Sequence, residues 1–491
     1  MRRQDIIRIG LVLLATCLIS PKKPLRTLVG FSIIGYFATD SLVLRSQESF
    51  IKIGLKGQDK SKRPPVPYIA ESMGVVAAVS YMFLMFLIIP FVFFKDLLYL
   101  NSHMDLYNSI GLESVEVLLR KNFPHNKLAQ YLSGMLCLQS TTLLGIFDDL
   151  FDIRWRHKIL IPAIAAMPML IVYYVDKGIT SIVVPQFVLK MPAGEYLVTI
   201  VAFIATLINK LATKMSGLSF SSLSSATSWE KLPLLLDLGV FYYIYMAAVS
   251  IFSPHSINIL AGVNGIEVGQ SLVLATILLV NDSLYLVSSR VLLPAYESHI
   301  QSAIFLIPFI GVSQGLLRHN WYPSKVFVGD TYCYFAGMVF AIVGILGHFS
   351  KTLLLFSVPQ IVNFLYSAPQ LFGLLPCPRH RLPRFDLNDG LMHPSHACVP
   401  ESSLNKLQRA LIYTLHYVHL LNVYTDDKGY LYFSNFTLIN LYLYWAGPLK
   451  ENTLCLLLLL LQLCVGLSFI FLRHTLGPWI FGYDNLSLSV K

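Results

Sequence analysis

Charged residues are scarce in this chain: Asp, Glu, Lys and Arg make up 13% of its 491 residues, whereas hydrophobic residues make up 55%. Soluble domains usually carry about 25% charged residues, so the composition excludes an ordinary soluble multidomain enzyme and indicates a membrane protein. Acids are scarcer than bases, with 27 Asp+Glu against 37 Lys+Arg. Nucleic-acid binding fits poorly with so many apolar segments, whereas basic loops on the cytoplasmic side of a membrane fit well.

Cysteine is also sparse. The seven cysteines lack the close, even spacing of a disulfide framework, so we do not expect disulfides to hold the fold. Several histidines and cysteines crowd one polar loop, namely Cys377, His380, His393, His396 and Cys398. Their spacing matches no common zinc site, so we expect no zinc there.

Ten apolar runs are long enough to cross a membrane with some tilt, and they predict an all-α polytopic membrane protein. They lie near 27–44, 73–94, 129–147, 159–175, 234–252, 268–287, 300–317, 332–349, 352–375 and 453–472. A further apolar run, 6–19, lacks a small-residue cleavage site after it. We therefore expect residues 1–26 to be retained as an anchor or an eleventh span.

The runs divide the rest of the chain into three parts. Residues 27–375 form the predicted transmembrane catalytic domain, 376–452 the only sizeable polar region, and 453–491 the last span with a C-terminal tail. With ten spans, the loops after the odd-numbered helices share one face, and they carry most of the loop Lys and Arg. The positive-inside rule places this face, with 376–452 as an appendage, in the cytoplasm.

One apolar segment, 196–209, would reverse this topology if it crossed the membrane alone. It has only 14 residues, which favours an interfacial or re-entrant segment. We therefore interpret 190–230, which contains a serine-rich stretch, as an insertion on the lumenal side.

The most informative polar cluster follows the third predicted span. Asp148, Asp149 and Asp152 directly precede a basic stretch that ends at Lys158. Ionisable groups near lipid are costly and by default indicate a functional site. Carboxylates suit Mg²⁺ or general-base catalysis, and a lysine suits a diphosphate. The competing interpretation is a solvated helix end with internal ion pairs and interfacial anchors.

Other polar motifs fall on the same predicted face. The glycine-rich stretch 255–269 contains Asn258 and Asn264, which could coordinate a cation or contact a base, although such residues also form ordinary turns. Asp330 follows a glycine and could cap a helix or bind a metal. The stretch 376–384 offers arginines for bidentate phosphate contacts, or alternatively a basic patch on the membrane surface.

Seven motifs occur in an order that resembles one family over about Gly30 to Leu472. They are Gly-Ile-Phe-Asp-Asp (145–149), Arg-Trp-Arg-His-Lys (154–158), Ile-Asn-Ile-Leu-Ala-Gly-Val-Asn-Gly (257–265), Asn-Trp-Tyr-Pro-Ser (320–324), Phe-Val-Gly-Asp-Thr (327–331), Gly-Ile-Leu-Gly-His-Phe-Ser-Lys (344–351) and Pro-Cys-Pro-Arg-His-Arg (376–381). The chain resembles the eukaryotic UDP-N-acetylglucosamine:dolichyl-phosphate N-acetylglucosamine-1-phosphate transferases, within the polyprenyl-phosphate sugar-1-phosphate transferase superfamily. Its loops look most like those of fungal members.

The resemblance implies a ten-helix enzyme of the endoplasmic reticulum membrane with a cytoplasmic active site. It would transfer GlcNAc-1-phosphate from UDP-GlcNAc to dolichyl phosphate and release UMP, the first step of N-glycan precursor synthesis and the target of tunicamycin. A homodimer, contact with membrane lipid and association with the next GlcNAc transferase are further expectations.

The resemblance also implies roles for individual residues. Asn258 and Asp330 would coordinate Mg²⁺, Lys158 and Arg379 would hold phosphates, and Asp148 and Asp149 would position or activate the acceptor. The uridine pocket would be lined by Gln58, Glu71, Asn264 and Phe327. His380 and Arg381 would approach GlcNAc, and Trp155 would stand where the lipid enters. Asp152 and His255 occupy positions where Asn occurs in the family, so neither is assigned a role.

Three other functions compete with this interpretation. An intramembrane prenyltransferase would need a second Asp-x-x-x-Asp motif, which the sequence lacks. A transporter would show symmetric halves and charges in mid-helix. A transferase for another sugar nucleotide is excluded only by the resemblance. Two glycosylation sequons begin at Asn435, expected to be silent in the cytoplasm, and at Asn485, expected to be lumenal.

Overall fold

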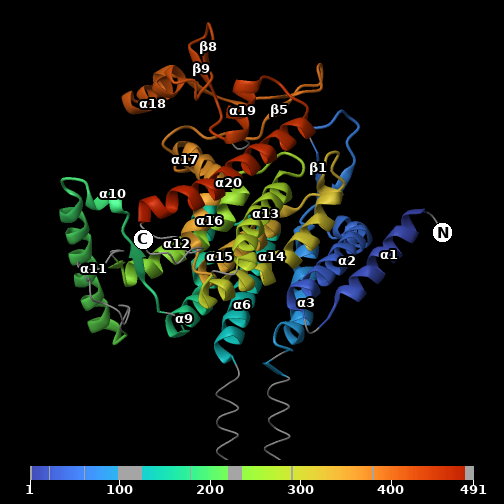
Figure 1. Cartoon of the computed structure of the whole chain (residues 1–491). Coiled ribbons are helices and arrows are strands. Elements are labelled where there is room, and N and C mark those ends of the chain that lie inside the picture. The colour runs from blue at the N-terminus through green and yellow to red at the C-terminus, as the bar shows by residue number, and fades with distance from the viewer. Residues whose placement is uncertain are drawn as a thin grey trace, which may run out of the picture.

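The computed structural model describes residues 3–20, 23–59, 61–94, 96–97, 124–176, 178–218, 235–288, 291–378 and 381–481. Helices dominate this part of the chain, and its strands form only small two- and three-stranded sheets (Figure 1). The prediction of an all-α polytopic membrane protein is therefore confirmed.

The helices before the central loops are α1 (Arg3–Leu18), α2 (Pro24–Lys52), α3 (Gly74–Val92), α6 (His125–Phe151), α7 (Trp155–Lys158), α8 (Ile161–Ala165), α9 (Met167–Asp176), α10 (Gln186–Leu189) and α11 (Gly194–Ser216). They are followed by α12 (Val240–Ile259), α13 (Ile266–Val287), α14 (Leu293–Asn320), α15 (Gly329–Leu346), α16 (Ser350–Phe356), α17 (Val358–Leu371), α18 (Lys406–Tyr417), α19 (Leu438–Ala446) and α20 (Glu451–Phe481). The strands are β1 (Lys56–Gln58), β2 (Tyr68–Ala70), β3 (Ser181–Val183), β4 (Leu235–Asp237), β5 (Arg384–Phe385), β6 (Met392–His393), β7 (His396–Pro400), β8 (Val423–Thr425) and β9 (Tyr430–Ser434).

Within the described residues, nine helices are long and apolar enough to cross a membrane, or ten if the bent pair α16–α17 counts as one span. Eight of the nine cover predicted spans, and α16–α17 covers 352–375. The predicted span 129–147 forms the 27-residue helix α6, but α6 is not among the nine. Polar side chains such as Gln130 and Thr141 lower its apolar character, and they are buried in the bundle rather than facing lipid.

The ninth candidate span is α11, which contains the segment 196–209. The helix has 23 residues, which is long enough to cross a membrane. The length of 14 residues, on which we based the prediction of an interfacial or re-entrant segment, is therefore too short. The predicted topology does not depend on this helix, because β3 and β4 pair antiparallel, with Ser181 opposite Asp237. The two ends of the insertion therefore lie next to each other, so the end of α9 and the start of α12 are on the same side of the bundle.

Helix α15 is the centre of the bundle. All of its residues from Thr331 to Leu346 are buried, as expected for a helix that is apolar around its whole circumference. It packs against α6, α12, α3 and α14, and α2 packs along α14. Gly145 allows α6 to approach closely, because a Cβ at that position would lie 2.6 Å from the Cα of Thr331. This packing brings the end of α6 beside the start of α15.

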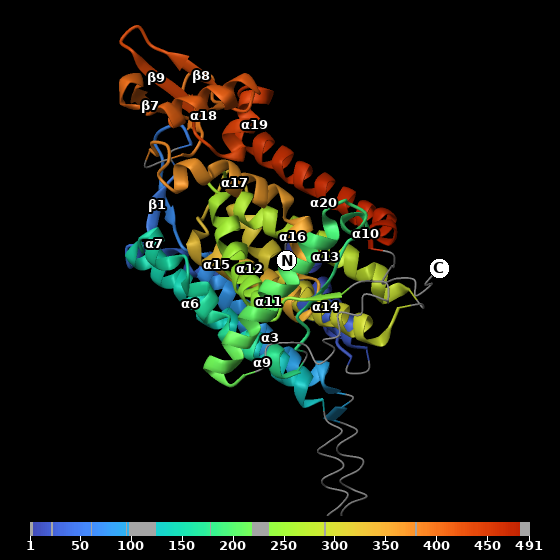
Figure 2. The ribbon, with the colours of Figure 1, turned by 90° about the vertical axis from the view of Figure 1, so that its left-hand side faces the viewer.

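The polar region 376–452 forms an appendage at the end of the bundle where β1 lies (Figures 1 and 2). Its three-stranded sheet has the order β7-β9-β8 and packs against α18 around a small apolar core that includes Leu421, Phe433 and Phe436. Asn435, in the first sequon, is only 1% exposed and donates from its amide to Ser395. Asn485, in the second sequon, lies outside the described residues.

Candidate active site

The acidic cluster predicted from the sequence forms where α6 ends and α15 begins. The ammonium of Lys158, in α7, lies 2.5 Å from Oδ2 of Asp148 and 3.1 Å from Oδ2 of Asp330. The side chain of Asp148 is only 1% exposed, whereas that of Asp330 is 34% exposed. One lysine thus connects a buried carboxylate to a carboxylate that is open to a ligand.

Asp149 caps helix α15 from the neighbouring helix. Its carboxylate accepts hydrogen bonds from the backbone N–H groups of Asp330 and Thr331, at 2.7 and 3.2 Å, and from the Thr331 hydroxyl at 2.6 Å. Such bonds satisfy amides that a helix N-terminus leaves unpaired. Gly329 has φ +71° and lies so close that a Cβ there would be 2.5 Å from Asp149 Oδ2. The glycine therefore makes room for the carboxylate that fixes Asp330.

Helix α12 contributes two further side chains to the cluster, the amide of Asn258 and the imidazole of His255. The side chain of Asn258 lies beside the Asp330 carboxylate. One turn earlier, His255 is buried against Tyr334, with ring centroids 5.6 Å apart, and it lies close to the backbone of Lys158 and Ile159. His255 thus packs behind Lys158, whereas Asn258 lies at the open carboxylate.

The β1–β2 hairpin adds a fourth carboxylate. A Cβ at Gly57 would lie 3.1 Å from the ring of Phe327 and 3.4 Å from the Glu71 carboxylate, so these two predicted pocket residues are neighbours. The Phe327 N–H donates to the carbonyl of Ala70 at 2.8 Å, which ties the hairpin to the segment before α15. Partial burial, with the charges of Asp149 and Asp330, raises the pKa of Glu71. The hairpin therefore forms one wall of the acidic cluster.

A second network fixes Asn264 in the loop between α12 and α13. Its side-chain amide donates to Asp59 at 2.8 Å, and its backbone N–H donates to Glu451 at 2.8 Å. Lys62 lies 3.1 Å from Asp59 and 2.7 Å from Glu451, and its ammonium is 4.0 Å from the ring centroid of Tyr322. Sequence reasoning assigned no site role to Glu451, because its partners are distant in the sequence and no local pattern connects them.

Comparison of the sequence with known proteins identifies the family of this chain. Residues 131–213 and 210–348 match the model of Glycosyl transferase family 4. Over 98% of its length, the chain is 47% identical to the UDP-N-acetylglucosamine–dolichyl-phosphate N-acetylglucosaminephosphotransferase of Saccharomyces cerevisiae, 99% of which is covered. The chain belongs to this family of transferases. The relatives of the same name in Schizosaccharomyces pombe and Dictyostelium discoideum are 43% and 35% identical, over 95% and 84% of this chain and 95% and 80% of their own.

The remaining residues predicted for this transferase lie in the loop that enters the appendage or near α7. Arg381 is fixed through its carbonyl, which accepts from Asn440 at 2.9 Å, and the next residue, Leu382, contacts Gly262. The loop therefore lies over the glycine-rich stretch, as a ligand-contacting role requires. Arg379 and His380 lie outside the described residues, as does the side chain of Trp155.

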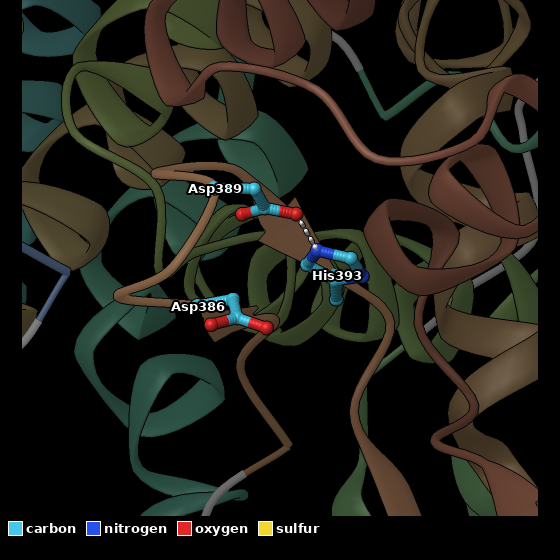
Figure 3. Close-up of side chains that lie close together, drawn as sticks. All are labelled: Asp386, Asp389 and His393. Atoms are coloured by element: carbon cyan, nitrogen blue, oxygen red, sulfur yellow. Dashed lines mark hydrogen bonds and ion pairs between the residues drawn. The ribbon is translucent and has the colours of Figure 1, made fainter.

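The transferase has a second group of metal-ligating side chains at the β5–β6 hairpin (Figure 3). The ligand atoms of Asp386, Asp389 and His393 lie within 4.8 Å of one another. Each carboxylate accepts from a backbone N–H of its own turn, Asn388 at 2.9 Å and Leu391 at 2.8 Å, and Asp389 also contacts His393 at 2.7 Å. These bonds stabilise an exposed turn, which explains the group without a metal. Of the histidines and cysteines that crowd this loop in the sequence, only His393 belongs to the group.

The acidic cluster fits a magnesium ion by its donor set. Glu71, Asp148, Asp149 and Asp330 bring four carboxylates near Lys158, which leaves an excess of negative charge that a divalent cation would offset. Asp330 is the open carboxylate, and the Asn258 amide beside it can offer an oxygen, both of which are ligand types that Mg²⁺ accepts. Asp149 and Asp148 are already committed to the α15 N-terminus and to Lys158.

Proposed function

We propose that this chain transfers GlcNAc-1-phosphate from UDP-GlcNAc to dolichyl phosphate and releases UMP. The observation that carries the proposal is the Asp148–Lys158–Asp330 cluster at the end of a membrane helix bundle, in a chain that is 47% identical to a transferase named for this donor and acceptor. The membrane is that of the endoplasmic reticulum, with the cluster facing the cytoplasm. The basic loops on the same side of the chain support this orientation.

The reaction joins two anions, so charge stabilisation and positioning are the main tasks of the site. Asp330 and Asn258 would hold Mg²⁺, which would supply positive charge to the donor diphosphate. Lys158 holds the phosphates between the acids, and Arg379 contributes a second cation. Because Lys158 already contacts Asp148 and Asp330, its position is set before substrate binds.

The acceptor phosphate attacks in line without a covalent enzyme intermediate. An oxygen of dolichyl phosphate forms a bond to the β-phosphorus, the phosphorus that carries GlcNAc. The bond from that phosphorus to the oxygen shared with the α-phosphate breaks, and its electron pair leaves with UMP. The acceptor phosphate is ionised near neutral pH, so Asp148 and Asp149 orient the groups around it rather than remove a proton.

The donor and acceptor reach the cluster from different sides. Glu71 and Phe327 at the hairpin, with Gln58 and the fixed Asn264, hold uridine. His380 and Arg381 contact the GlcNAc group, and Trp155 lies where the dolichyl chain enters from the lipid. Tunicamycin inhibits by occupying this site. A homodimer and an association with the transferase that adds the second GlcNAc complete the proposal.

The decisive experiment is a membrane assay with radiolabelled UDP-GlcNAc and dolichyl phosphate. Wild type should give a Mg²⁺-dependent, tunicamycin-sensitive lipid product, and Asp330→Ala should lose it by at least about 100-fold, as for removal of a main electrostatic group. Asp389→Ala, in the exposed hairpin turn, is the control and should keep activity. Full activity in Asp330→Ala would remove this residue from the site, and product from another sugar nucleotide alone would overturn the donor.

A further inference from the structure

A cavity of about 470 Å³ lies at the end of the bundle opposite the acidic cluster. It is formed by the ends of α13 and α20, the start of α14, the α15–α16 turn and β3. Helix α15 begins at the acidic cluster and has 18 residues, so at about 1.5 Å per residue the cavity lies about 27 Å away. That is close to the ~30 Å of a bilayer core, which places the cavity at the other membrane face.

The polar side of this cavity is cationic. Lys351 and Arg473 both line it, and among the described lining residues none is Asp or Glu. Arg473 donates one hydrogen bond to the buried amide oxygen of Asn281 at 3.0 Å and lies over the ring of Tyr285. This contact fixes the guanidinium but offsets none of its charge.

A buried carboxylate beside the cavity is already engaged by other partners. Asp282, which is fully buried, lies 2.6 Å from Nδ1 of His299 and accepts from the Ser302 hydroxyl at 2.5 Å. Within the part of the chain that the structure describes, neither Lys351 nor Arg473 forms an ion pair with a carboxylate. Two basic side chains of the cavity wall thus have no carboxylate partner among the described residues. The Lys351 ammonium lies 5.8 Å from the ring centroid of Tyr242.

The rest of the wall is mixed. Its polar part is formed by Ser298, His299, His348, Thr352 and His474, and its apolar part by aromatic and aliphatic side chains. Phe349, Pro478 and Phe481 line the cavity together with small aliphatic residues. The volume lies in the range of about 300–1,000 Å³ that small-molecule sites occupy. A ligand that fits this surface has an anionic group for the cations and a hydrocarbon part for the apolar wall, and it must be available at a membrane face.

We propose that this cavity binds the phosphate headgroup of an anionic phospholipid from the leaflet opposite the active site. Lys351 and Arg473 hold the phosphate, and the apolar wall between α14 and α20 covers the first part of an acyl chain. The site is separate from the proposed reaction. It also gives a role to the Gly344–Lys351 motif, which supplies Phe349 and Lys351 and which the transfer chemistry leaves unused.

The experiment counts lipid that stays bound to the purified full chain by native mass spectrometry, after exposure to equal amounts of phosphatidylglycerol and phosphatidylcholine. Wild type should retain phosphatidylglycerol in preference, and Lys351→Gln with Arg473→Gln should lower that preference on the order of tenfold, because charge-assisted hydrogen bonds are lost. Lys127→Gln is the matched control. This lysine is paired with Glu297, its side chain is 54% exposed, and it does not line the cavity.

A second variant separates the cavity from general surface charge. Ala295→Trp keeps both cations but fills space at the cavity wall, and it should also lose the retained lipid. Equal retention of the two lipids by wild type, or undiminished preference in either the double variant or Ala295→Trp, would overturn the proposal. If wild type binds inorganic phosphate but retains no phosphatidylglycerol, the site binds a free anion and the lipid assignment is wrong.

Discussion

The backbone N–H of Asp330 donates a hydrogen bond to the carboxylate of Asp149 at 2.7 Å, although the two residues belong to different helices. The side chain that we assign to the metal is therefore oriented by a neighbouring acid that need not touch the substrate. Asp149 is a positioning residue in this structure, since its second oxygen accepts both hydrogen bonds from Thr331.

Two replacements of Asp149 should distinguish its role in orienting Asp330 from a direct effect of its negative charge. Asp149→Ala removes the cap of α15, which costs about 0.5–2 kcal/mol of stability, and lets Asp330 move. Asp149→Asn keeps one acceptor oxygen for the Asp330 amide. We expect the concentration of Mg²⁺ for half-maximal activity to rise strongly in Asp149→Ala and much less in Asp149→Asn. Equal defects in both variants would mean that the charge of Asp149 acts directly.

Gly329 should not tolerate a side chain. Gly329→Ala places a Cβ 2.5 Å from Asp149 Oδ2 in a residue with φ +71°, so both the backbone and the cap are strained. Gly373→Ala is the matched control, because Gly373 also has φ +71° but has no atom within 4 Å of the added Cβ. The control should lose about 1–2 kcal/mol of stability and keep activity. Gly329→Ala should lose more stability in thermal unfolding and most of its activity; equal losses would contradict the steric argument.

Glu71 should make stability depend on pH. Burial and the nearby Asp149 and Asp330 raise the pKa of Glu71 above its ordinary value of 4.5 in the folded state. The native chain then binds more protons than the unfolded chain between pH 4.5 and that raised pKa, so the stability of wild type falls as pH rises through this window. Glu71→Gln should flatten that part of the curve of melting temperature against pH, measured with a chelator. An unchanged slope would show that Glu71 does not titrate there.

The network around Asn264 should affect donor binding more than turnover. Glu451→Ala removes the acceptor of the Asn264 N–H and the partner of Lys62, so the loop that we assign to uridine loses its support. We expect a higher KM for UDP-GlcNAc with little change in kcat, as for lost ground-state binding. Glu297→Ala removes an exposed partner of Lys127, a pair that contributes at most about 1 kcal/mol, and is the control. A selective loss of kcat would assign Glu451 to the chemistry instead.

The sequence predicted the architecture well where the physical signal was local. Long apolar runs predicted most spans, and the Asp148–Asp149 and Gly329–Asp330 motifs predicted a shared cluster that the structure brings together. Their individual tasks were not predictable. The sequence predicts that Lys158 binds phosphate and gives ion pairs with the nearby acids only as the competing interpretation. In the structure Lys158 also joins Asp148 to Asp330, and the second contact spans 172 residues.

The points at which the structure differs from the prediction have physical causes as well. The segment 196–209 was judged by its apolar core alone, but helix α11 continues through Lys210 and Lys214, whose long side chains a helix end at a membrane surface accommodates. Helix α6 was predicted as a simple span, but several of its polar residues, such as Gln130 and Thr141, are buried in the bundle. Glu451 could not be found from the sequence, because burial beside Lys62 and Asn264 depends on the packing of three distant segments.

The small β3–β4 pair has a consequence for how this chain is made and modified. Antiparallel pairing of Ser181–Val183 with Leu235–Asp237 closes the base of the long loop between these two strands. Helices made before and after it can insert into the membrane in a fixed relation, whatever length of chain is held between the two strands. An epitope tag or a reporter domain placed in that loop should therefore leave the orientation of every later helix unchanged.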